Sequence, residues 1–537
     1  MFKIHAPMIR YNSAHQLSIE EFRTPFEMNM DKENRWVLLG ALIPWDALAR
    51  VYYSMMDADR GAPAVDARIV IGALIVKHKE GLDDRRAIEY IRENPYVQYF
   101  LGLSTYTSEA VFDRSLFTHL RHRIGAKEFD CFNREIIGKA EEIEKQVLGK
   151  GHHKKQVGHG AFPEKKQEEA VGVSPETQAA PPSCVQENKG QLQIDATVAD
   201  QMISWPTDLG LLHTSREESE RLIDTLHKRA PGKKKPRTYR RVARKRYLAV
   251  AKKKHRTKKE IRKGIGQQLH YLQRNIRSIH QLLDVQEADG ALGWPLGRRD
   301  QKIFWVIQQI CSQQKQMHTD GSHRHSDRIV NIYQPHVRPI VRGKAKGDVE
   351  FGAKLGVSLE KGFARISTIS WNAYNENTDL KKQAEAYKEM HGYYPEVILA
   401  DGIYGTRENR GWMKERHIRF SGKTLGRPSQ TPVPYAQRRE LQKERNQRNH
   451  IEGKFGQGKN GYNLSRIRAR VQGTSESWIS CIFFVMNLVA LMKIADKAGA
   501  VFLFAFFLTA IALAAGAFYA IKERQKSRCA HLFVKST

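Results

Sequence analysis

The chain has 537 residues and carries 89 Lys plus Arg against 58 Asp plus Glu, a formal net charge of +31. This length predicts two or three domains, and the charge favours a polyanionic partner because cations near phosphates release condensed counterions. The five cysteines are scattered without a Cys-x-x-Cys pair, which argues against a disulfide framework or a zinc ribbon. We therefore expect a protein of the reducing cytoplasm.

Residues 20–125 are predicted to form an all-α domain. Apolar residues recur at helical spacing in residues 36–39 and 69–76, with breaks at Pro44, Gly81 and Asn94-Pro95. Asp83 is expected to cap the helix that runs to residue 93. Residues 149–190 are rich in Gly, Lys, Glu, Gln and Pro, and this composition predicts a flexible linker.

A strand-like run around Asp195 follows, and then a mostly helical, strongly basic stretch over residues 217–283. Between residues 228 and 263 there are 19 Lys plus Arg against one acid, Glu260. Such a run is either a solvated or disordered insert or a DNA-contacting surface. We favour DNA contact, with cations that position the DNA without reading its sequence.

Strand patterns return at residues 328–333, 349–358 and 363–370, and Gly362 between the last two predicts a hairpin. Residues 380–390 have a helical pattern, residues 397–400 form a short apolar run typical of a buried strand, and residues 478–493 predict a final soluble helix.

Residues 498–521 contain no charge and are rich in Phe, Leu and Ala. A helix of roughly 20 such residues spans a bilayer, and the cations that follow would keep the C-terminus in the cytoplasm. Two alternatives stay open, namely a buried or partner-packed terminal helix and an extension reached by frameshift.

Three acids stand in patterns that suit phosphoryl transfer. Asp195 lies in an apolar strand-like run, and Asp401 follows another. Glu452 lies four residues after Arg448 and seven before Lys459, so a helix would align all three on one stripe. A carboxylate flanked by cations suits a metal site beside a phosphate backbone, although nearby Gly453, Gly456 and Gly458 weaken the local case for a helix.

Short motifs in a fixed order resemble the insertion-sequence transposases of the DDE type, in the branch with an InsH-like N-terminal domain. The resemblance covers most of residues 20–493. It rests on Asn34-Arg35-Trp36-Val37, Ile43-Pro44-Trp45-Asp46, Glu93-Asn94-Pro95-Tyr96, Ile194-Asp195-Ala196-Thr197, Trp205-Pro206-Thr207-Asp208-Leu209, Arg342-Gly343-Lys344, Glu350-Phe351-Gly352-Ala353-Lys354, Tyr374-Asn375-Glu376, Ala400-Asp401-Gly402-Ile403-Tyr404-Gly405 and the stretch from Arg448 to Lys459.

The resemblance implies an α/β, RNase H-like catalytic core over residues 191–493, built on a mixed sheet and interrupted by the basic helical insertion. The N-terminal helical domain would bind DNA. The first Asp would lie on a central strand, the second at the end of a parallel neighbour, and the Glu on a later helix. Residues 397–400 agree, since doubly covered strands are continuously apolar and sites lie at strand carboxyl ends.

The resemblance also implies that Asp195, Asp401 and Glu452 are catalytic and hold Mg²⁺ or Mn²⁺, the cations that hard oxygen ligands favour. Two metal ions would activate the attacking oxygen and stabilise the leaving one. The DNA-binding residues would be Arg448, Lys459, Arg342, Lys344 and Arg445, the last standing where the family often has a tyrosine.

The implied function is DNA transposition, in which the enzyme binds the terminal inverted repeats of its element, cuts there and joins the ends to target DNA. A homodimer or larger oligomer is expected, because both ends must be joined together. Two alternatives stay open, an RNase H-like nuclease or resolvase and an inactive DNA-binding relic tethered to a membrane through residues 498–521.

Other residues compete for these roles. Asp208 is a rival first acid, but it follows Pro206-Thr207 and resembles a turn or cap. Trp205 and Trp371 would stack on an unpaired base or, as we favour, pack in the core. A histidine group lacks a matching second pair, so a zinc site is improbable there; its members are His318, His323 and His325.

Overall fold

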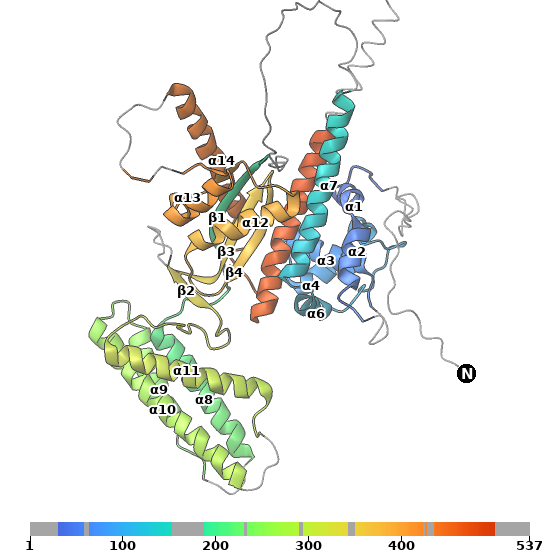
Figure 1. The fold of residues 1–537 in the computed structure, drawn as a ribbon. Coiled ribbons are helices and arrows are strands. Elements are labelled where there is room, and N and C mark those ends of the chain that lie inside the picture. The colour runs from blue at the N-terminus through green and yellow to red at the C-terminus, as the bar shows by residue number, and fades with distance from the viewer. Residues whose placement is uncertain are drawn as a thin grey trace, which may run out of the picture.

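The computed structural model describes residues 30–57, 64–152, 187–229, 234–288, 294–341, 349–422, 425–426 and 434–499. Within these residues the chain forms an N-terminal helical region, a mixed sheet with helices on both faces, and a separate bundle of four long helices (Figure 1). The expected linker at 149–190 falls mostly outside the described residues, and so do residues 500–521 of the uncharged segment.

Seven helices make up the N-terminal region, as its apolar periodicity predicts. Asp83 caps α4 by accepting hydrogen bonds from the backbone N–H groups of Arg85 and Arg86, and Asn94 ends that helix because Pro95 begins the next. The helices are α1 (Arg35–Leu42), α2 (Trp45–Tyr53), α3 (Ala67–Lys79), α4 (Asp84–Glu93), α5 (Pro95–Phe100), α6 (Leu116–Arg123) and α7 (Ala126–His152).

The sheet has six strands in the order β2-β3-β1-β5-β6, with β4 also paired to β3. Strand β1 is antiparallel to β3 and parallel to β5, so the sheet is mixed, as an RNase H-like core requires. Its strands are β1 (Gln191–Asp200), β2 (Arg338–Val341), β3 (Val349–Glu360), β4 (Phe363–Ser370), β5 (Val397–Leu399) and β6 (Arg419–Phe420).

Strands β3 and β4 form the predicted hairpin. Glu360 pairs with Phe363, and the two residues between them, Lys361 and Gly362, both have positive φ, at 48° and 89°. Positive φ at both central positions is the two-residue turn whose twist matches that of the flanking strands. Gly362 adopts this conformation without strain, which explains why the turn forms there.

The two faces of the sheet are covered differently. Leu192 and Ile194 of β1 pack with Leu380 of α12 and Met413 of α13 in one core. On the opposite face, Ala199 and the apolar residues of β3 pack with α14 and with the helix Gln472–Gly499, the C-terminal helix below. The covering elements are η3 (Glu376–Thr378), α12 (Asp379–His391), η4 (Gly402–Tyr404), α13 (Arg407–Glu415) and α14 (Tyr435–Gly461).

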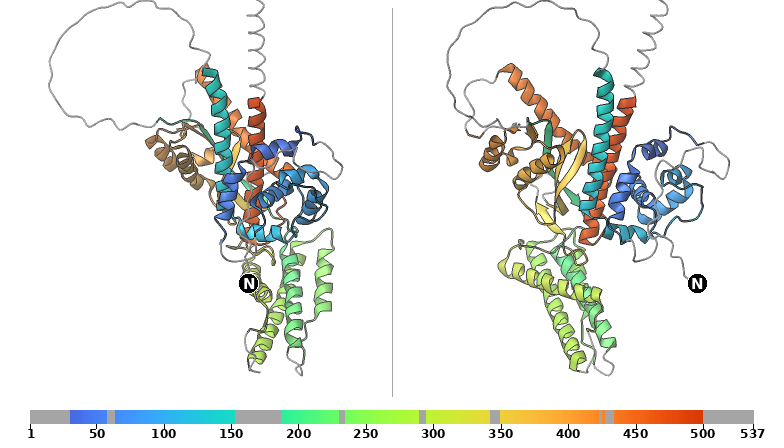
Figure 2. Two further views of the ribbon diagram at one scale, coloured as in Figure 1. Left: turned by 90° about the vertical axis from the view of Figure 1, so that its right-hand side faces the viewer. Right: turned by 45° about the vertical axis from the view of Figure 1, so that its right-hand side comes forward.

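The C-terminal helix also completes the core of the N-terminal region. Its Phe484 packs against Phe129 and Phe132 of α7, with ring centroids 5.9 Å and 5.5 Å apart, and α7 lies beside it in every view (Figure 2). Asn487, fully buried, bonds Asn133 of α7 and both backbone groups of Ala364 in β4. One helix therefore joins the N-terminal region to the sheet.

By length and composition the C-terminal helix could also cross a membrane. However, 67% of its apolar window is buried inside the protein, where it serves two hydrophobic cores. Its apolar character is therefore explained by packing within the described residues, and residues 472–499 carry no argument for membrane insertion.

The basic insertion forms an antiparallel bundle with its own hydrophobic core, drawn from residues 209–332. Its helices are α8 (Asp208–Lys228), α9 (Arg240–Ala251), α10 (Lys258–Ala288) and α11 (Arg298–Asp320). The helical stretch is thus wider at both ends than the 217–283 expected from the sequence, because α8 begins at the Thr207 cap and α11 follows a short break.

The strand expected at residues 328–333 is wrong. Arg328 is drawn into an ion pair with Asp208 at 2.7 Å, and the backbone N–H of Ile329 donates to the Gln313 side chain. Ile329 and Ile332 are buried against the bundle. The alternating apolar pattern of this run therefore packs on helices and does not pair with another strand.

Candidate active site

Asp195 lies at the middle of β1, opposite Val357 of β3. The strand forms because apolar residues alternate along it, and Ile194 and Ala196 on either side of the acid are buried on one face. Asp195 therefore points to the opposite face, the one that α14 covers. Its Oδ1 atom accepts a hydrogen bond from the Ala196 N–H at 2.8 Å.

Asp401 follows β5, the parallel neighbour of β1. The last pair of the ladder is Gln193 with Leu399, and each acid lies two residues beyond that pair in its own segment. The exposed Asp401 carboxylate caps η4 by accepting the Gly402 N–H at 2.6 Å. The acid thus stands where the buried strand meets solvent, at the carboxyl end of a parallel strand.

Glu452 lies on α14, which is one continuous helix through its glycines. Ile451 and Phe455 anchor that helix on the sheet, and this packing outweighs the low helix propensity of glycine. Arg448 pairs with Glu452 at 3.3 Å, one turn apart. The predicted stripe of a carboxylate and cations is therefore present, and Arg445, one turn earlier, is exposed.

Lys459 continues the stripe along α14 and pairs with Glu350 of β3 at 3.4 Å. The helix approaches its neighbours closely here, since a Cβ on Gly458 would lie 3.2 Å from Leu464 and 3.4 Å from the Met486 sulfur. Two other predicted DNA-binding residues, Arg342 and Lys344, lie outside the described residues.

The surroundings of Asp195 disfavour the charged form of its carboxyl group. The pKa of Asp195 is raised to about 6, chiefly by burial and also by the carboxylates of Glu376 and Glu452, while the Ala196 N–H and Arg448 act to lower it. Acids with raised pKa values inside a cluster of charges are typical of functional sites. Arg448 and Glu452 are thus near enough to Asp195 to act on its charge.

Glu376 is a fourth acid to which the sequence patterns assigned no role. It opens η3 after β4 and pairs with Lys354 of β3 at 2.9 Å. Beside it lies the fully buried Tyr404, whose hydroxyl has no hydrogen-bond partner and whose pKa is raised by burial and by Glu376 and Asp195. The Tyr374-Asn375-Glu376 motif, directly before a helix, was the available signal.

The donor chemistry of this site fits a hard divalent cation. Carboxylate oxygens are the ligands of Mg²⁺ and Mn²⁺, and a cation would offset the repulsion that Glu376 and Glu452 exert on Asp195. Among the residues that the structure describes, however, no three His, Cys, Asp or Glu side chains are already grouped closely enough to hold a metal ion.

The rival residues have structural partners. Asp208 accepts hydrogen bonds from Gln314 at 2.6 Å and Arg328 at 2.7 Å at the start of α8. Core packing is confirmed for Trp371, which is buried and donates to Glu476 at 2.8 Å. It is wrong for Trp205, which is 69% exposed and contacts the edge of the Phe351 ring. Within the part of the chain that the structure describes, no group of three or more potential metal ligands includes His318, His323 or His325.

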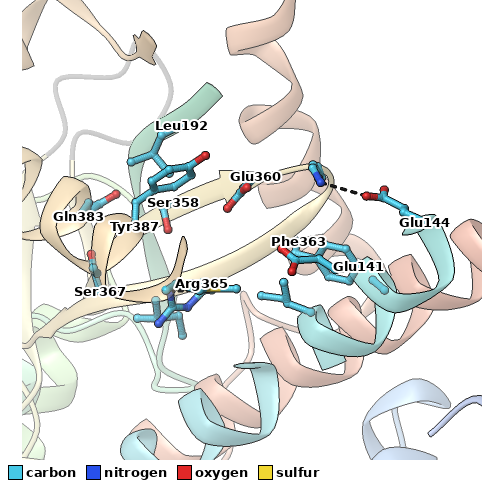
Figure 3. A pocket seen from close by; sticks show the side chains of 16 residues that line it. Glu141, Glu144, Leu192, Ser358, Glu360, Phe363, Arg365, Ser367, Gln383 and Tyr387 are labelled. Carbon is cyan, nitrogen blue, oxygen red and sulfur yellow. Dashed lines mark hydrogen bonds and ion pairs between the residues drawn. The ribbon is translucent and has the colours of Figure 1, made fainter. Parts of the chain in front are cut away.

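A cavity lies elsewhere, between α7, the β3–β4 hairpin and α12 (Figure 3). It holds about 40 Å³ of open space, and Lys361 and Glu144 form an ion pair of 2.9 Å beside it. Space of this size suits one or two water molecules, which would meet the buried, unpaired amide of Gln383. None of the three predicted acids lines it, so it belongs to the junction of α7 with the sheet.

Comparisons with known proteins agree with this architecture. Residues 398–489 match the family described as Transposase DDE domain, and residues 25–123 match the family described as Transposase domain (DUF772). The first match contains Asp401 and Glu452, whereas Asp195 and the helical bundle lie outside both.

A Rhizobium meliloti protein described as "Uncharacterized protein ORF8 in nfe locus" is 32% identical over 104 residues, which are 19% of this chain and 50% of that protein. The match therefore spans about half the length of that relative. No solved structure matches the chain. The chain thus carries an N-terminal match to one transposase domain family and a C-terminal match to a transposase DDE domain family, and the two together support an insertion-sequence DDE transposase.

Proposed function

We propose that the chain is a transposase that binds the terminal inverted repeats of its insertion sequence and catalyses strand cleavage and strand transfer with a divalent cation, Mg²⁺ or Mn²⁺. The observation that carries the proposal is the position of Asp195, a partly buried acid of raised pKa next to Glu452. Asp401 supports it, because the parallel register of β1 and β5 leads to the same edge of the sheet.

Asp195, Asp401 and Glu452 would hold the cation. When bound, a divalent cation activates the attacking oxygen and stabilises the leaving oxygen of a phosphodiester. The attacking group is water for cleavage and a DNA 3′-hydroxyl for joining, so no covalent link to the protein is needed. Burial of Asp195 in the sheet keeps its carboxylate fixed while the DNA is positioned.

Arg448, Lys459 and Arg445 would hold the DNA backbone. All three project from one stripe of α14 and therefore follow the helix past Glu452. Arg448 also neutralises Glu452, with which it pairs. When a cation and DNA are bound, Glu452 would contact the cation and Arg448 would contact a phosphate. We extend the same role to Arg342 and Lys344 on the resemblance alone.

The exposed cations of the bundle would add DNA contacts that do not depend on sequence. On α9, Arg241, Arg244 and Lys245 are exposed, and among the described residues none of them forms an ion pair. Cations of this kind bind the phosphate backbone and make affinity depend steeply on salt. The enzyme would act as a homodimer or larger oligomer, because two element ends must be brought together.

The test is a strand-transfer assay with the purified full chain, Mg²⁺, and DNA that carries the element's ends. Asp195→Asn, Asp401→Asn and Glu452→Gln should each abolish cleavage and joining while leaving DNA binding intact. Glu408→Gln is the control, since that acid of α13 is 79% exposed in its side chain and pairs only with Lys381. Cleavage without joining would indicate a nuclease. DNA binding without cleavage or joining in either Mg²⁺ or Mn²⁺ would indicate an inactive relic.

A further inference from the structure

The helical bundle presents two exposed indoles that its own folding does not use. Trp305 on α11 and Trp294, just before that helix, are each 58% exposed. Exposing an indole forgoes the favourable burial of a large apolar surface, and the bundle already has a complete core. The bundle also lies outside both family matches, so neither match accounts for these side chains.

The packing of α11 holds Trp305 outward. Its chain neighbours Phe304 and Val306 are 4% and 1% exposed and both belong to the bundle core, so the helix cannot rotate to bury the indole. Arg298 and Lys302 precede Trp305 by seven and three residues, spacings that place all three on one stripe of the helix. We call Arg298, Lys302 and Trp305, together with Trp294 in the segment that leads into the helix, the α11 face.

The cations of the α11 face are not neutralised by the protein. Within the described residues neither Arg298 nor Lys302 forms an ion pair, and both are exposed. The acid of the same turn, Asp300, is held by Arg221 at 2.8 Å. By contrast, Arg240 at the start of α9 is paired with Asp224 at 2.9 Å. The α11 face therefore combines free positive charge with open aromatic surface.

The α11 face lies beside the sheet domain. Burial and the charge of Lys302 lower the pKa of His336 to about 4, so the ammonium group is near that ring. His336 in turn meets Trp371 edge-on at 4.3 Å, and Trp371 bonds Glu476 in the C-terminal helix. The α11 face is therefore linked to the sheet domain through His336 and Trp371.

We propose that the α11 face binds an unpaired DNA strand, with Trp305 and Trp294 stacking on bases and Arg298 and Lys302 contacting phosphates. Cations alone would suit duplex DNA equally well, but the faces of duplex bases are covered by their neighbours. Indoles beside a basic stripe are the combination that binds single strands with little sequence preference. The inference rests on the proposed function only for the source of that strand, which is DNA opened at the element ends.

The test measures binding of the full-length protein to a fluorescein-labelled oligo(dT) strand and to a blunt duplex of equal length, in EDTA. Trp305→Ala should weaken oligo(dT) binding roughly 5- to 100-fold, the value of one lost stacking contact, and leave duplex binding within about twofold. Trp305→Phe should restore most of the loss. Lys302→Ala should lower the salt dependence of oligo(dT) binding by roughly 0.7 in the log–log slope, and Trp305→Ala should not.

Val242→Ala is the matched control, because that apolar side chain is 46% exposed on α9 of the same bundle and is not part of the α11 face. It should leave oligo(dT) affinity unchanged. Equal losses for single strand and duplex in Trp305→Ala would overturn the stacking proposal, as would an unchanged affinity. A fall in sedimentation mass on substitution would instead identify the face as a protein interface. The binding assay runs in EDTA, which removes the cation that cleavage requires. A failure of the strand-transfer assay would therefore count against the proposed function and not against single-strand binding by the α11 face.

Discussion

Two helical regions flank the mixed sheet, and they are built on different principles. The N-terminal helices share their core with the C-terminal helix, through Phe484, Val485 and Leu488. The bundle from α8 to α11 has a core drawn from its own stretch of chain, within residues 209–332. Both regions are amphipathic and helical by sequence, so helical pattern alone does not reveal which region is autonomous.

The difference follows from what each region has available to bury. The bundle packs four long helices against one another, which encloses a core without outside help. The N-terminal helices α1 to α6 are short, and the fully buried Trp36, Trp45 and Phe117 are part of a cluster that extends to the C-terminal helix. Whether a helical region folds on its own therefore depends on whether its core needs residues from distant parts of the sequence.

The largest expected effect tests this contrast directly. Phe484→Ala should destabilise the protein by about 3–5 kcal/mol, the usual cost of removing a buried aromatic ring, and should lower hydrogen-exchange protection in α7 and in β4 together. Leu272→Ala, at a fully buried position of the bundle core, should cost about 2–5 kcal/mol but lower protection only in α8 to α11.

Hydrogen exchange read out by mass spectrometry separates these regions, since each peptide reports its own opening free energy. If Leu272→Ala also lowered the protection of the sheet, the bundle would not be an independent unit. If Phe484→Ala spared the sheet, the shared core would not couple it to the N-terminal helices.

A smaller effect is expected where the bundle joins the sheet. Asp208→Ala leaves Arg328 and Gln314 without their shared acceptor, and an unpaired buried partner costs about 1–3 kcal/mol. The loss should appear in the thermal unfolding of the bundle, and DNA cleavage at low temperature should persist. If a folded Asp208→Ala protein lost cleavage completely, Asp208 would again be a candidate for the first catalytic acid.

The smallest expected change is a gain. The pKa of Asp195 is raised to about 6 from its ordinary 3.8, so the folded state binds this proton more tightly than the unfolded state does. The stability that this group contributes is therefore lost as the pH rises from its ordinary pKa of 3.8 through its folded-state pKa of about 6. Asp195→Asn should therefore stabilise metal-free protein at pH 7 by about 1–2 kcal/mol, and the gain should vanish near pH 4.

Denaturant titrations of both proteins at the two pH values measure this gain. A less stable Asp195→Asn protein at pH 7 would show that the carboxylate serves the fold and is not strained. Neither helical region should respond, so the measurement also provides a reference for the larger effects above.

Much of the fold was predictable from local pattern. The α4 cap at Asp83, the hairpin turn at Gly362 and the apolar run before Asp401 each depend on short-range physics, and the structure contains all three. The run at residues 328–333 does not form the predicted strand because Ile329 and Ile332 pack in the core of the bundle while Val330 packs in the core of the sheet. The role of the C-terminal helix in two cores was not predictable, since it depends on contacts hundreds of residues apart.

The candidate site was predictable as residue types in order, but not as geometry. The strand patterns predicted Asp195 and Asp401 as site residues because ligands of α/β sheets bind at the carboxyl ends of strands, and their catalytic role stays a prediction. The stripe of α14 followed from spacing, although three glycines argued against a helix that packing nonetheless holds. Glu376 was assigned no role because a single acid before a helix is a common capping pattern, and only the sheet brings it toward Asp195.

The shared core has a consequence for how this protein is made. The N-terminal helices leave the ribosome first, yet part of their core is supplied by Phe484 and Leu488, close to the end of the described chain. Contacts over such separations close slowly, and the exposed apolar surface must wait through most of synthesis. The bundle can fold as soon as it emerges, whereas a product truncated before residue 484 would carry the candidate acids Asp195 and Asp401 on a protein with an open core.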